Sequence, residues 1–490
     1  MAYLKRIIIL LVFIFLLTIL FRVYAEDRAT LNTKLDKVIK LSIDKNRIPG
    51  LAVSAVKNGE VVYSSGFNGF LSKSEKNITI DTPFYIGSIS KSFTALAIMK
   101  LVEAGKIDLD NPVQDYISNF QIDNSGFEGI ITVRHLLHHR SGLTEKEYFK
   151  DLPDSISIDA GVKDLYGMKL SHNPGEQFSY FNPNYNILGF IIEKVSGQSY
   201  ETYLSENILK PLEMNNTYLK SEDASKVVTG HGAVFSIPVK REEEFKTYSL
   251  PSGYIISTVS DMTNYLLYHL SGEYKGRKLL SKEYFNALHI PYNNKERGYG
   301  MGWNKGVKFN QPIVEHGGSL FNYSSNMAFL PESQTGLVLL INQNHFIYSI
   351  ISNNQIVDNI LKVLLNPQID ISEINVIPLG NIFIFLAIVA LLTIIKEIYQ
   401  LLNLNKWLSK IKSKSKIYLF FNIALEFLIP AFLLIGIPMI FTIMFNRALS
   451  PGPAFQLMPG VSSWVIIVSI LSIIRGTLKI YKIYNNKNIL

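Results

Sequence analysis

The sequence predicts an α/β fold with a mainly antiparallel sheet flanked by helices, followed by transmembrane helices at the C-terminus. Strand-like runs occur at 50–67 and again within 298–342, and helical patterns fill most of the stretch between them. This order favours a sheet in which the first and last strands are neighbours. The long apolar runs after residue 378 contain few charged residues, which is typical of helices that cross a bilayer.

Composition and charge separate the chain into a domain and its apolar ends. Hydrophobic residues make up 48% of the 490 residues, a high share for a soluble protein. Of the net charge of +8, residues 1–25 contribute +3 and residues 377–490 contribute +9, so that residues 26–376 carry −4. A mildly acidic domain lacks the basic surface that nucleic-acid binding needs, and no nucleic-acid partner is expected. The absence of cysteine excludes disulfides, thiolate catalysis and cysteine zinc sites.

The N-terminal residues 1–25 are typical of a secretory signal peptide. Two basic residues precede an apolar run at 7–21, and the compact side chains up to Ala25 are followed by the polar pair Glu26-Asp27. The alternative is an uncleaved N-terminal anchor, although the run is shorter than the roughly 20 residues that a span needs. Either interpretation places the chain from residue 26 onward outside the cytoplasm.

The domain is expected to begin with an amphipathic helix over 31–48. Two strands at 50–57 and 60–67 follow, and the Asn58-Gly59 pair between them is a strong hairpin signal. Further helices are expected at 88–104, near 132–139, at 184–196, within 250–272 and at 349–365. Further strands are expected at 298–303, 312–316, 323–330 and 335–342.

The first candidate for chemistry is the pair Ser88 and Lys91, at the start of a long apolar helix that Gly105 ends. Positions i and i+3 share a helix face, so the lysine amine is expected beside the serine hydroxyl. An amine in an apolar wall loses its proton more readily and can activate the hydroxyl as a nucleophile. The same Ser-x-x-Lys spacing occurs without a long apolar helix behind it at Ser42, Ser54, Ser409 and Ser413.

Two short motifs lie downstream of this pair. Tyr180–Asn182 follows a polar loop and leads into a predicted helix, and His316–Ser319 joins a predicted strand. Each motif is common by itself. Together, and in this order after Ser88, they indicate one site built from three distant parts of the chain.

With these motifs the sequence resembles the serine β-lactamase and penicillin-binding-protein superfamily. It is most similar to the branch that holds class C β-lactamases, D-alanyl-D-alanine carboxypeptidases, D-aminopeptidases and related esterases. The resemblance covers about residues 33–345 and lies in Phe84–Ser92, Ile131–Leu143, Tyr180–Asn182, Tyr299–Trp303 and His316–Gly318. It implies a β-lactamase/transpeptidase-like fold with a helical subdomain, and a serine hydrolase that forms an acyl-enzyme.

The resemblance also implies roles for the catalytic residues. Ser88 corresponds to the nucleophile, and Lys91 and Tyr180 would share the transferred proton. Nearby cations would lower the pKa of the Tyr180 phenol toward phenolate. The expected chemistry needs no metal and no other cofactor.

Four further positions are expected to bind the substrate by the same resemblance. Asn182 would orient it through its side-chain amide, and His316 would close the site with a donor or a positive charge. The backbone N–H groups of Ser88 and Ser319 would form the oxyanion hole, because Gly318 lets the strand approach closely.

The sequence departs from the family pattern at Gly317, where many members carry the threonine of Lys-Thr-Gly or His-Thr-Gly. That hydroxyl helps to bind a substrate carboxylate, so recognition of D-alanyl-D-alanine or β-lactams does not follow from the resemblance. The Ser-Asp-Asn element and the acidic deacylation loop of class A enzymes have no visible counterpart either.

Two groups of side chains near these motifs allow a functional and a structural interpretation. The first group is His135, His138 and His139, which have the helical spacing of metal ligands. It lacks an acidic partner and resembles a structural helix of the family, so no metal site is expected. The other group is aromatic and lines either a substrate groove or, for most members, the core: Tyr299, Trp303, Phe321 and Tyr323.

The C-terminal part is predicted to anchor the domain. A polar linker at 367–378 precedes three apolar spans within 379–480, near 379–395, 417–443 and 457–474. Lysine is enriched in the loop between the first two spans and after the third, including the tail at 481–490, which places both in the cytoplasm and residues 26–366 outside. Serines interrupt the third span, which makes it the weakest of the three.

Glu426 lies inside the middle predicted span. A charge at that depth is costly and by default indicates function or a pairing partner. The favoured interpretation is a protonated residue, or one that is hydrogen-bonded between helices, that holds the three spans together.

The sequence therefore predicts a multi-pass cell-membrane protein with an extracytoplasmic serine hydrolase domain. Its expected partners are a small-molecule or peptide substrate with an ester or amide bond, and the lipid bilayer; the sequence leaves protein partners open. Two alternatives stay open: a non-catalytic sensor or scaffold for wall peptides or β-lactams, and a true β-lactamase.

Overall fold

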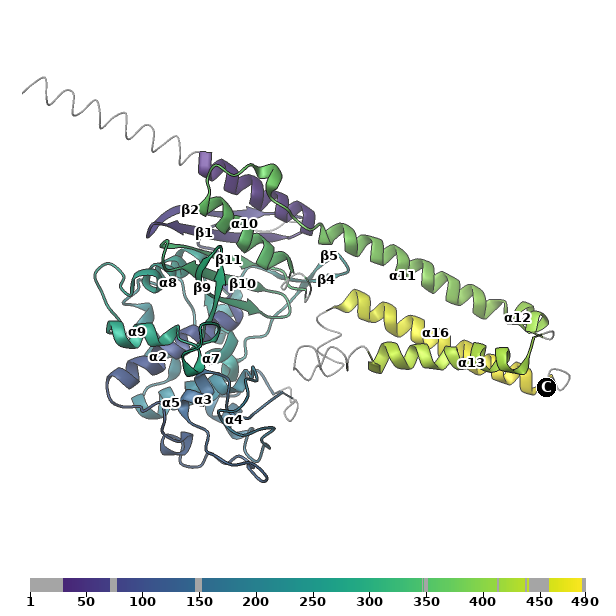
Figure 1. The fold of residues 1–490 in the computed structure, drawn as a ribbon, viewed down its shortest axis with the longest axis horizontal. Helices are drawn as coiled ribbons and strands as arrows, with labels where there is room; N and C mark the ends of the chain where they lie inside the picture. Colours follow the sequence, from purple (N-terminus) through teal and green to yellow (C-terminus); the bar gives the residue numbers. More distant parts are fainter. Residues whose placement is uncertain are drawn as a thin grey trace, which may run out of the picture.

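The computed structural model describes residues 30–70, 77–145, 152–345, 347, 351–411, 414–436, 439 and 458–486. Figure 1 shows a domain of mixed helices and strands, from one side of which three long helices extend. The predicted signal peptide or anchor and most of 437–443 lie outside the described residues.

A seven-stranded sheet with the order β2-β1-β11-β10-β9-β8-β7 forms the centre of the domain. All neighbouring strands are antiparallel, and Leu51 of β1 pairs with Ile341 of β11, so the predicted adjacency of the first and last strands is confirmed. The strands are β1 Gly50–Lys57, β2 Glu60–Asn68, β7 Gly298–Tyr299, β8 Asn304–Lys308, β9 Gln311–Ser319, β10 Ser324–Leu330 and β11 Thr335–Ile341. Two small sheets pair β3 Phe84–Tyr85 with β6 Ile256–Ser257, and β4 Gly230–Val234 with β5 Ile237–Arg241.

Helices cover both faces of this sheet and build a helical region beside it (Figure 1). One helix runs over 30–46. The others in the domain are α2 Ser90–Glu103, α3 Val133–Leu137, α4 Ile158–Lys163, α5 Pro183–Ser196, α6 Tyr200–Leu204, α7 Leu250–Gly253, α8 Val259–Ser271, α9 Lys282–Leu288 and α10 Asn353–Leu365. The C-terminal helices are α11 Leu379–Leu402, α12 Leu404–Ile411, α13 Lys416–Ala431 and α16 Pro459–Tyr484.

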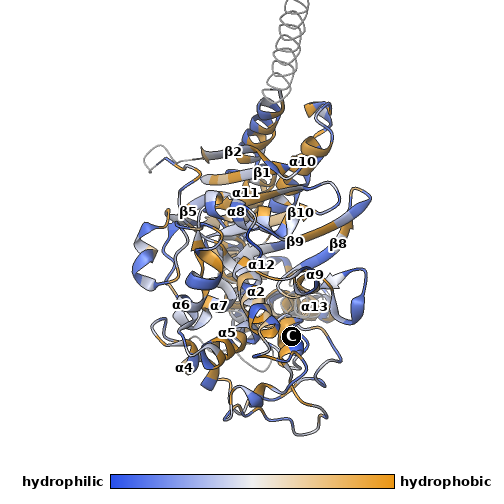
Figure 2. Cartoon of the chain, turned by 90° about the vertical axis from the view of Figure 1, so that its left-hand side faces the viewer, coloured by the Kyte–Doolittle hydropathy of each residue, from blue (hydrophilic) through white to orange (hydrophobic). Residues whose placement is uncertain are grey.

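Side chains of β1 alternate between two hydrophobic cores, because successive residues of a strand point to opposite faces. Leu51 and Val53 pack in the core that holds the 30–46 helix and α10, whereas Ala52 and Val56 pack in the core that holds α2 and α8. Figure 2 shows the apolar residues gathered along the strands and the helices that face them, with hydrophilic residues in the surface loops. Burial on both faces explains why β1 reads as a nearly continuous apolar run.

The hairpin between β1 and β2 has the turn that its sequence predicts. Asn58 and Gly59 both have positive φ, 54° and 76°, as the central residues of a type I′ turn require. Three strand pairs were not predicted, one of which is the short β3–β6 pair. The β4–β5 hairpin lies in a stretch without a clear alternating pattern, and the predicted strand at 298–303 is reduced to β7 and followed by the polar strand β8.

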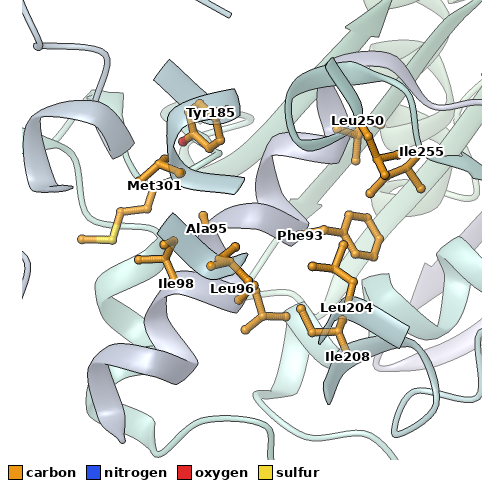
Figure 3. Close-up of a cluster of buried hydrophobic side chains, with 14 of the residues drawn as sticks. Phe93, Ala95, Leu96, Ile98, Tyr185, Leu204, Ile208, Leu250, Ile255 and Met301 are labelled. Atoms are coloured by element: carbon orange, nitrogen blue, oxygen red, sulfur yellow. The ribbon is translucent and has the colours of Figure 1, made fainter. Parts of the chain in front are cut away.

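The apolar run after Ser88 forms the central helix of the domain, α2. Its start differs slightly from the prediction, because Ser88 lies in a 3₁₀ turn, Gly87–Ile89, that leads into α2. Gly105 has φ 68° after the last turn, as the sequence predicts. Figure 3 shows Phe93 and Leu96 of α2 among apolar side chains from other helices: Leu204, Ile208 and Leu250. Packing on all sides fixes the position of the residues at the start of α2.

The three C-terminal helices α11, α13 and α16 are long and apolar enough to cross a membrane. Their few polar side chains meet where the helices contact one another. Glu426 of α13 accepts hydrogen bonds from Lys479 Nζ at 2.7 Å and from Arg475 Nε at 2.9 Å, and Arg475 also pairs with Glu397 of α11. The interpretation of Glu426 as a residue bonded between helices is confirmed, with the added finding that cations of α16 are its partners.

Three of the four serines that interrupt the third predicted span face the other helices. Ser462, Ser469 and Ser472 are buried, and Ser472 Oγ donates to Glu426 Oε2 at 2.7 Å, whereas Ser463 is exposed. A Cβ on Gly476 would lie 2.8 Å from the Cβ of Glu426, so this glycine allows close helix approach. Small and polar residues thus mark the packed side of α16, which is also the least apolar of the three candidate spans, as predicted.

Acidification is expected to destabilise the domain, because five histidines are held in the neutral form: the buried His138, His269, His316 and His345 and the half-buried His289. Burial lowers the pKa of each, to about 4 for His138 and about 3 for His289. In the unfolded chain these rings titrate near pH 6.5. Below about pH 6.5 the unfolded state therefore binds protons that the folded state does not, and stability falls by about 1.4 kcal/mol per pH unit for each ring.

The midpoint of thermal unfolding of the full chain, followed from about pH 7.5 to about pH 5, measures this loss. His289→Phe removes one of the groups, which pairs with His269 at 3.1 Å inside an aromatic cluster. This variant is expected to show a shallower pH dependence than the parent chain. An unchanged pH dependence would contradict the assignment of His289 as a neutral ring.

Candidate active site

Ser88 and Lys91 lie together at the start of α2. Lys91 Nζ is 3.0 Å from Ser88 Oγ, 2.8 Å from Asn182 Oδ1 and 2.7 Å from the carbonyl oxygen of Ser252. The two latter oxygens can only accept hydrogen bonds, whereas a hydroxyl can donate. An unprotonated amine can thus donate to Asn182 and Ser252 and accept from Ser88. The geometry suits a lysine that takes the serine proton.

Three elements place these groups. α2 carries Lys91, the start of α5 carries Asn182, and α7 supplies the carbonyl of Ser252. The side chain of Lys91 is fully buried, so water does not compete for its amine. The sequence predicted the pairing of Ser88 with Lys91 from their spacing, and the structure also brings Asn182 to the same amine.

The strand β9 lies directly against the residues that precede Ser88. A Cβ on Gly87, which has φ 53°, would lie 2.6 Å from the backbone nitrogen of Ser319. A Cβ on Gly318 would lie 2.1 Å from the carbonyl oxygen of Ile86. Only glycines permit this approach. The structure therefore brings the backbone of Ser319 beside the start of the Ser88 turn, as an oxyanion hole requires.

Gly318→Ala is expected to lower acylation at least about 100-fold, because the added methyl group must push β9 away from the Ser88 turn and misplace one oxyanion donor. The adjacent Gly317→Ala is a matched control. A Cβ there meets only ordinary contacts, 3.7 Å from the carbonyl oxygen of Ser325 and 3.8 Å from Asn326 Nδ2. Labelling rates with an active-serine probe measure both variants. Equal rates in the two variants would show that the approach of β9 to the turn is not needed.

Tyr180 lies beside the lysine amine. The centre of its ring is 4.9 Å from Lys91 Nζ, and the Tyr185 ring is 5.8 Å away. The aromatic faces stabilise a positive charge when the amine holds a proton. Ser88, Lys91, Tyr180 and the β9 segment thus converge on one place, although they come from distant parts of the chain.

His139 supports the segment that carries Tyr180, a role that the sequence did not reveal. Its Nδ1 accepts from the backbone N–H of Phe181 at 3.2 Å and lies 3.2 Å from Asn184 Nδ2, and its carbonyl accepts from Ser179 N at 2.8 Å. The His139 and Tyr180 rings are 4.3 Å apart. The histidine therefore positions the loop before α5.

The other two histidines of the His135, His138 and His139 group bond to different backbone atoms. His135 Nδ1 accepts from Thr132 N at 3.3 Å, and His138 Nδ1 lies 3.1 Å from the carbonyl oxygen of Tyr299. The three rings serve as separate structural groups. Among the residues that the structure describes, no cluster of three or more histidine, cysteine or acidic side chains could hold a metal ion.

His316 is buried and neutral. Its Nδ1 is 2.7 Å from the carbonyl oxygen of Gly317, which can only accept, so Nδ1 carries the proton and Nε2 accepts from Tyr299 Oη at 3.0 Å. Burial and the nearby charge of Lys91 lower the pKa of His316 to about 3. His316 was expected to contribute either a hydrogen-bond donor or a positive charge. A positive charge does not fit this neutral ring.

Asn344 is a site residue that sequence reasoning missed. Its Nδ2 donates to Ser319 Oγ at 2.7 Å and so holds the residue that follows Gly318. Asn344 lies in a short polar run directly after the fully buried strand β11. Such a switch to polar, buried side chains was the available signal.

The four aromatic residues proposed for a groove or the core have separate positions. Trp303 is buried beside the paired histidines of the core, far along the chain from Ser88. Tyr299 bonds to His316, and Tyr323 packs 5.2 Å from Tyr85. Phe321 lies under the guanidinium of Arg241 at 4.7 Å. Packing accounts for Trp303, whereas Tyr299 belongs to the site.

Comparison with known proteins identifies the family. The family model described as Beta-lactamase matches residues 35–359, which is more than half of the chain. The chain belongs to the Beta-lactamase family. The matched region contains every residue of the candidate active site, and the resemblance inferred from the motifs is confirmed.

Solved structures of Beta-lactamase relatives show the same fold. A structure of the octameric penicillin-binding protein homologue from Pyrococcus abyssi is 31% identical, with a TM-score of 0.59 over 68% of this chain and 77% of the other. A class C beta-lactamase is 23% identical, with a TM-score of 0.58 over 69% of this chain and 97% of the other. EstCE1, a hydrolase with promiscuous acyltransferase activity, is 20% identical, with a TM-score of 0.59 over 68% and 99%. At the last two identities the likeness shows the fold alone.

Among curated relatives, Protein flp of Staphylococcus aureus strain N315 is 30% identical over 316 residues. The match covers 64% of this chain and 63% of that protein, so the chain spans less than two thirds of its relative.

Proposed function

We propose that the chain is a membrane-anchored serine hydrolase that forms an acyl-enzyme through Ser88. The observation that carries the proposal is the 3.0 Å contact between Lys91 Nζ and Ser88 Oγ, with the amine oriented by Asn182 and Ser252. A nucleophile within hydrogen-bond reach of a base that is itself oriented by a third group is the arrangement that covalent catalysis needs. Membership of a family of mostly serine hydrolases supports the same conclusion.

The proposed reaction uses groups of this chain alone. Ser88 Oγ attacks the carbonyl carbon of an ester or amide while its proton passes to the amine of Lys91, directly or through Tyr180. The N–H groups of Ser88 and Ser319 receive the negative oxygen. Return of the proton releases the alcohol or amine and leaves an ester on Ser88. Water then attacks that ester and gives its proton to the same base, which passes it to Ser88 Oγ as the ester bond breaks and the carboxylic acid leaves.

The substrate is proposed to lack a free carboxylate beside the scissile bond. Gly317 offers no hydroxyl to such a group, and His316 is neutral and bonded on both nitrogens. A carboxylate bound there would lose its water without gaining a charged partner, which is costly. Neutral esters and amides therefore fit the site better than D-alanyl-D-alanine peptides or β-lactams.

The anchor is proposed to place the domain outside the cytoplasm. α11, α13 and α16 are each long and apolar enough to span a bilayer. Lysines concentrate after α11 and at the end of α16, which favours a cytoplasmic position for both. Three spans then put the residues before α11 on the other side of the membrane.

A substrate comparison with the purified full-length protein tests the proposal. The substrates are a short-chain p-nitrophenyl ester, a peptide ending in D-alanyl-D-alanine, and a chromogenic cephalosporin. We expect kcat/KM for the ester to exceed the other two at least about tenfold. Preferred turnover of the cephalosporin would instead identify a β-lactamase. Absence of both turnover and active-serine labelling would overturn the hydrolase proposal in favour of a non-catalytic sensor.

A further inference from the structure

We propose that the β4–β5 hairpin is a membrane-contacting element whose exposed apolar face lies in the headgroup region of the outer leaflet. The inference rests on the proposed membrane anchor and adds a second contact between the domain and the lipid. The sequence did not predict the strands β4 and β5, so the structure alone shows this hairpin.

The two faces of the hairpin differ. Val234 pairs with Ile237 and Gly232 pairs with Val239, and directly paired residues of antiparallel strands share a face. Val234, Ile237 and Val239 therefore lie on one face, and they are 40%, 54% and 46% exposed. The pair between them, Ala233 and Pro238, points to the opposite face and is buried. A short hairpin thus presents three adjacent branched apolar side chains outward.

The hairpin packs against the apolar helices through its other residues. Ala233 and Phe235 belong to a hydrophobic cluster with Leu379, Phe383 and Leu386 of α11 and with Val461 of α16. A Cβ on Gly460 would lie 2.5 Å from the backbone nitrogen of Phe235. Figure 1 shows β4 and β5 beside the first turns of α11. The contact therefore lies at the domain end of the helices.

Helix geometry gives the depth of the hairpin. Leu386 is seven residues beyond Leu379, which corresponds to about 10 Å along the helix axis. The headgroup region on each side of a bilayer is about 5–8 Å thick. A bilayer surrounds the helices, so segments that lie side by side are at the same depth in it. A segment packed beside Phe383 is therefore at the depth of the exposed Phe385 of α11.

Two features favour lipid as the occupant. The hairpin packs against the first turns of α11, where Ile382 and Phe385 are also apolar and are 43% and 64% exposed. β4 bonds on its other edge to the segment after β11, whereas β5 pairs with β4 alone among the described strands, and hydrocarbon would not tolerate its open edge. The headgroup region suits both features, because apolar side chains there reach the hydrocarbon while the backbone stays hydrated.

The same hairpin contacts the turn that follows the candidate oxyanion strand. Asn322 Nδ2 donates to the carbonyl oxygen of Arg241 at 2.7 Å, and a Cβ on Gly230 would lie 2.7 Å from the Tyr323 ring. Asn322 and Tyr323 lie three and four residues after Ser319, the last residue of β9. A membrane contact at β4–β5 therefore fixes the orientation of the active site relative to the lipid surface.

The absence of cysteine makes a site-specific test direct. Single-cysteine variants of the full-length protein receive an environment-sensitive fluorophore and are reconstituted in phosphatidylcholine–phosphatidylglycerol vesicles that contain nitroxide lipids. Ile237→Cys reports the hairpin. Ile130→Cys is the matched control, an isoleucine with 57% exposure in the loop before α3. Phe385→Cys reports insertion of α11.

We expect lipids with a nitroxide near the headgroup to reduce the fluorescence at Ile237→Cys by at least about half and to leave the fluorescence at Ile130→Cys unchanged. Strong quenching at Phe385→Cys establishes the anchor independently. An unquenched probe at Phe385→Cys would overturn the proposed anchor itself. Quenching at Phe385→Cys with none at Ile237→Cys would overturn only the hairpin contact. Cysteine cross-linking between two copies at position 237 without quenching would show that a second copy covers the face, and would also overturn it.

Discussion

Ser88→Ala is expected to abolish covalent labelling by a fluorophosphonate probe and to lower ester hydrolysis by about three orders of magnitude or more. The methyl group cannot form the acyl-enzyme, and Lys91 then has no hydroxyl to deprotonate at 3.0 Å. The helix behind it is held by packing that does not involve the hydroxyl, so the fold is expected to persist. Intact-mass measurement after probe treatment, with thermal unfolding of both proteins, checks the two expectations.

Ser409→Ala is the matched control, because Ser409 begins another Ser-x-x-Lys sequence but is exposed in α12. Its labelling should equal that of the parent chain. Labelling that survives in Ser88→Ala would show that the nucleophile has been wrongly assigned. Loss of labelling in both variants would show that the probe reports integrity of the protein and not the site.

Glu426→Gln is expected to destabilise the C-terminal helices by about 3–5 kcal/mol, the usual cost of breaking a buried ion pair. The substitution leaves Arg475 and Lys479 with a single buried acid, Glu397, so one cation is uncompensated. Thermal unfolding of the detergent-solubilised full chain measures the loss. Active-serine labelling at low temperature is expected to remain, because the site lies in the other part of the protein.

The double variant with Glu426→Gln and Lys479→Gln provides the control. It removes one charge of each sign, so that Arg475 and Glu397 still pair. We expect it to regain a large part of the lost stability. A double variant that is as unstable as the single one would show that packing at these positions, and not charge balance, holds the helices together.

The sequence predicted the elements whose conformation is determined by their own residues. Asn58-Gly59 specifies its own turn, and the apolar residues after Ser88 specify a helix that is buried on all sides. The hairpin β4–β5 escaped prediction because its apolar residues face the helices α11 and α16, and lipid by our proposal. Its pattern depends on surfaces more than 130 residues away, since Phe235 meets α11 only in the folded chain.

In the candidate site, too, local contacts were predicted and contacts that depend on strand pairing were not. The Ser-x-x-Lys spacing at the start of a long apolar helix predicted the contact of Lys91 with Ser88, and the resemblance to a family added the roles of Tyr180, Asn182 and His316. The bond between Tyr299 and His316 depends on the pairing of β7, β8 and β9, and that between Asn344 and Ser319 on the neighbouring strands. Strand register is not readable from one sequence, so the neutral state of His316 could not be foreseen.

The charge cluster between the C-terminal helices also has a consequence for synthesis. The acids Glu397 and Glu426 precede their cationic partners Arg475 and Lys479 in the chain, so they leave the ribosome first. If α11 and α13 enter a membrane as proposed, their two acids have no cationic partner from this cluster until α16 is synthesised. A chain terminated before residue 459 would keep both acids and lose both cations.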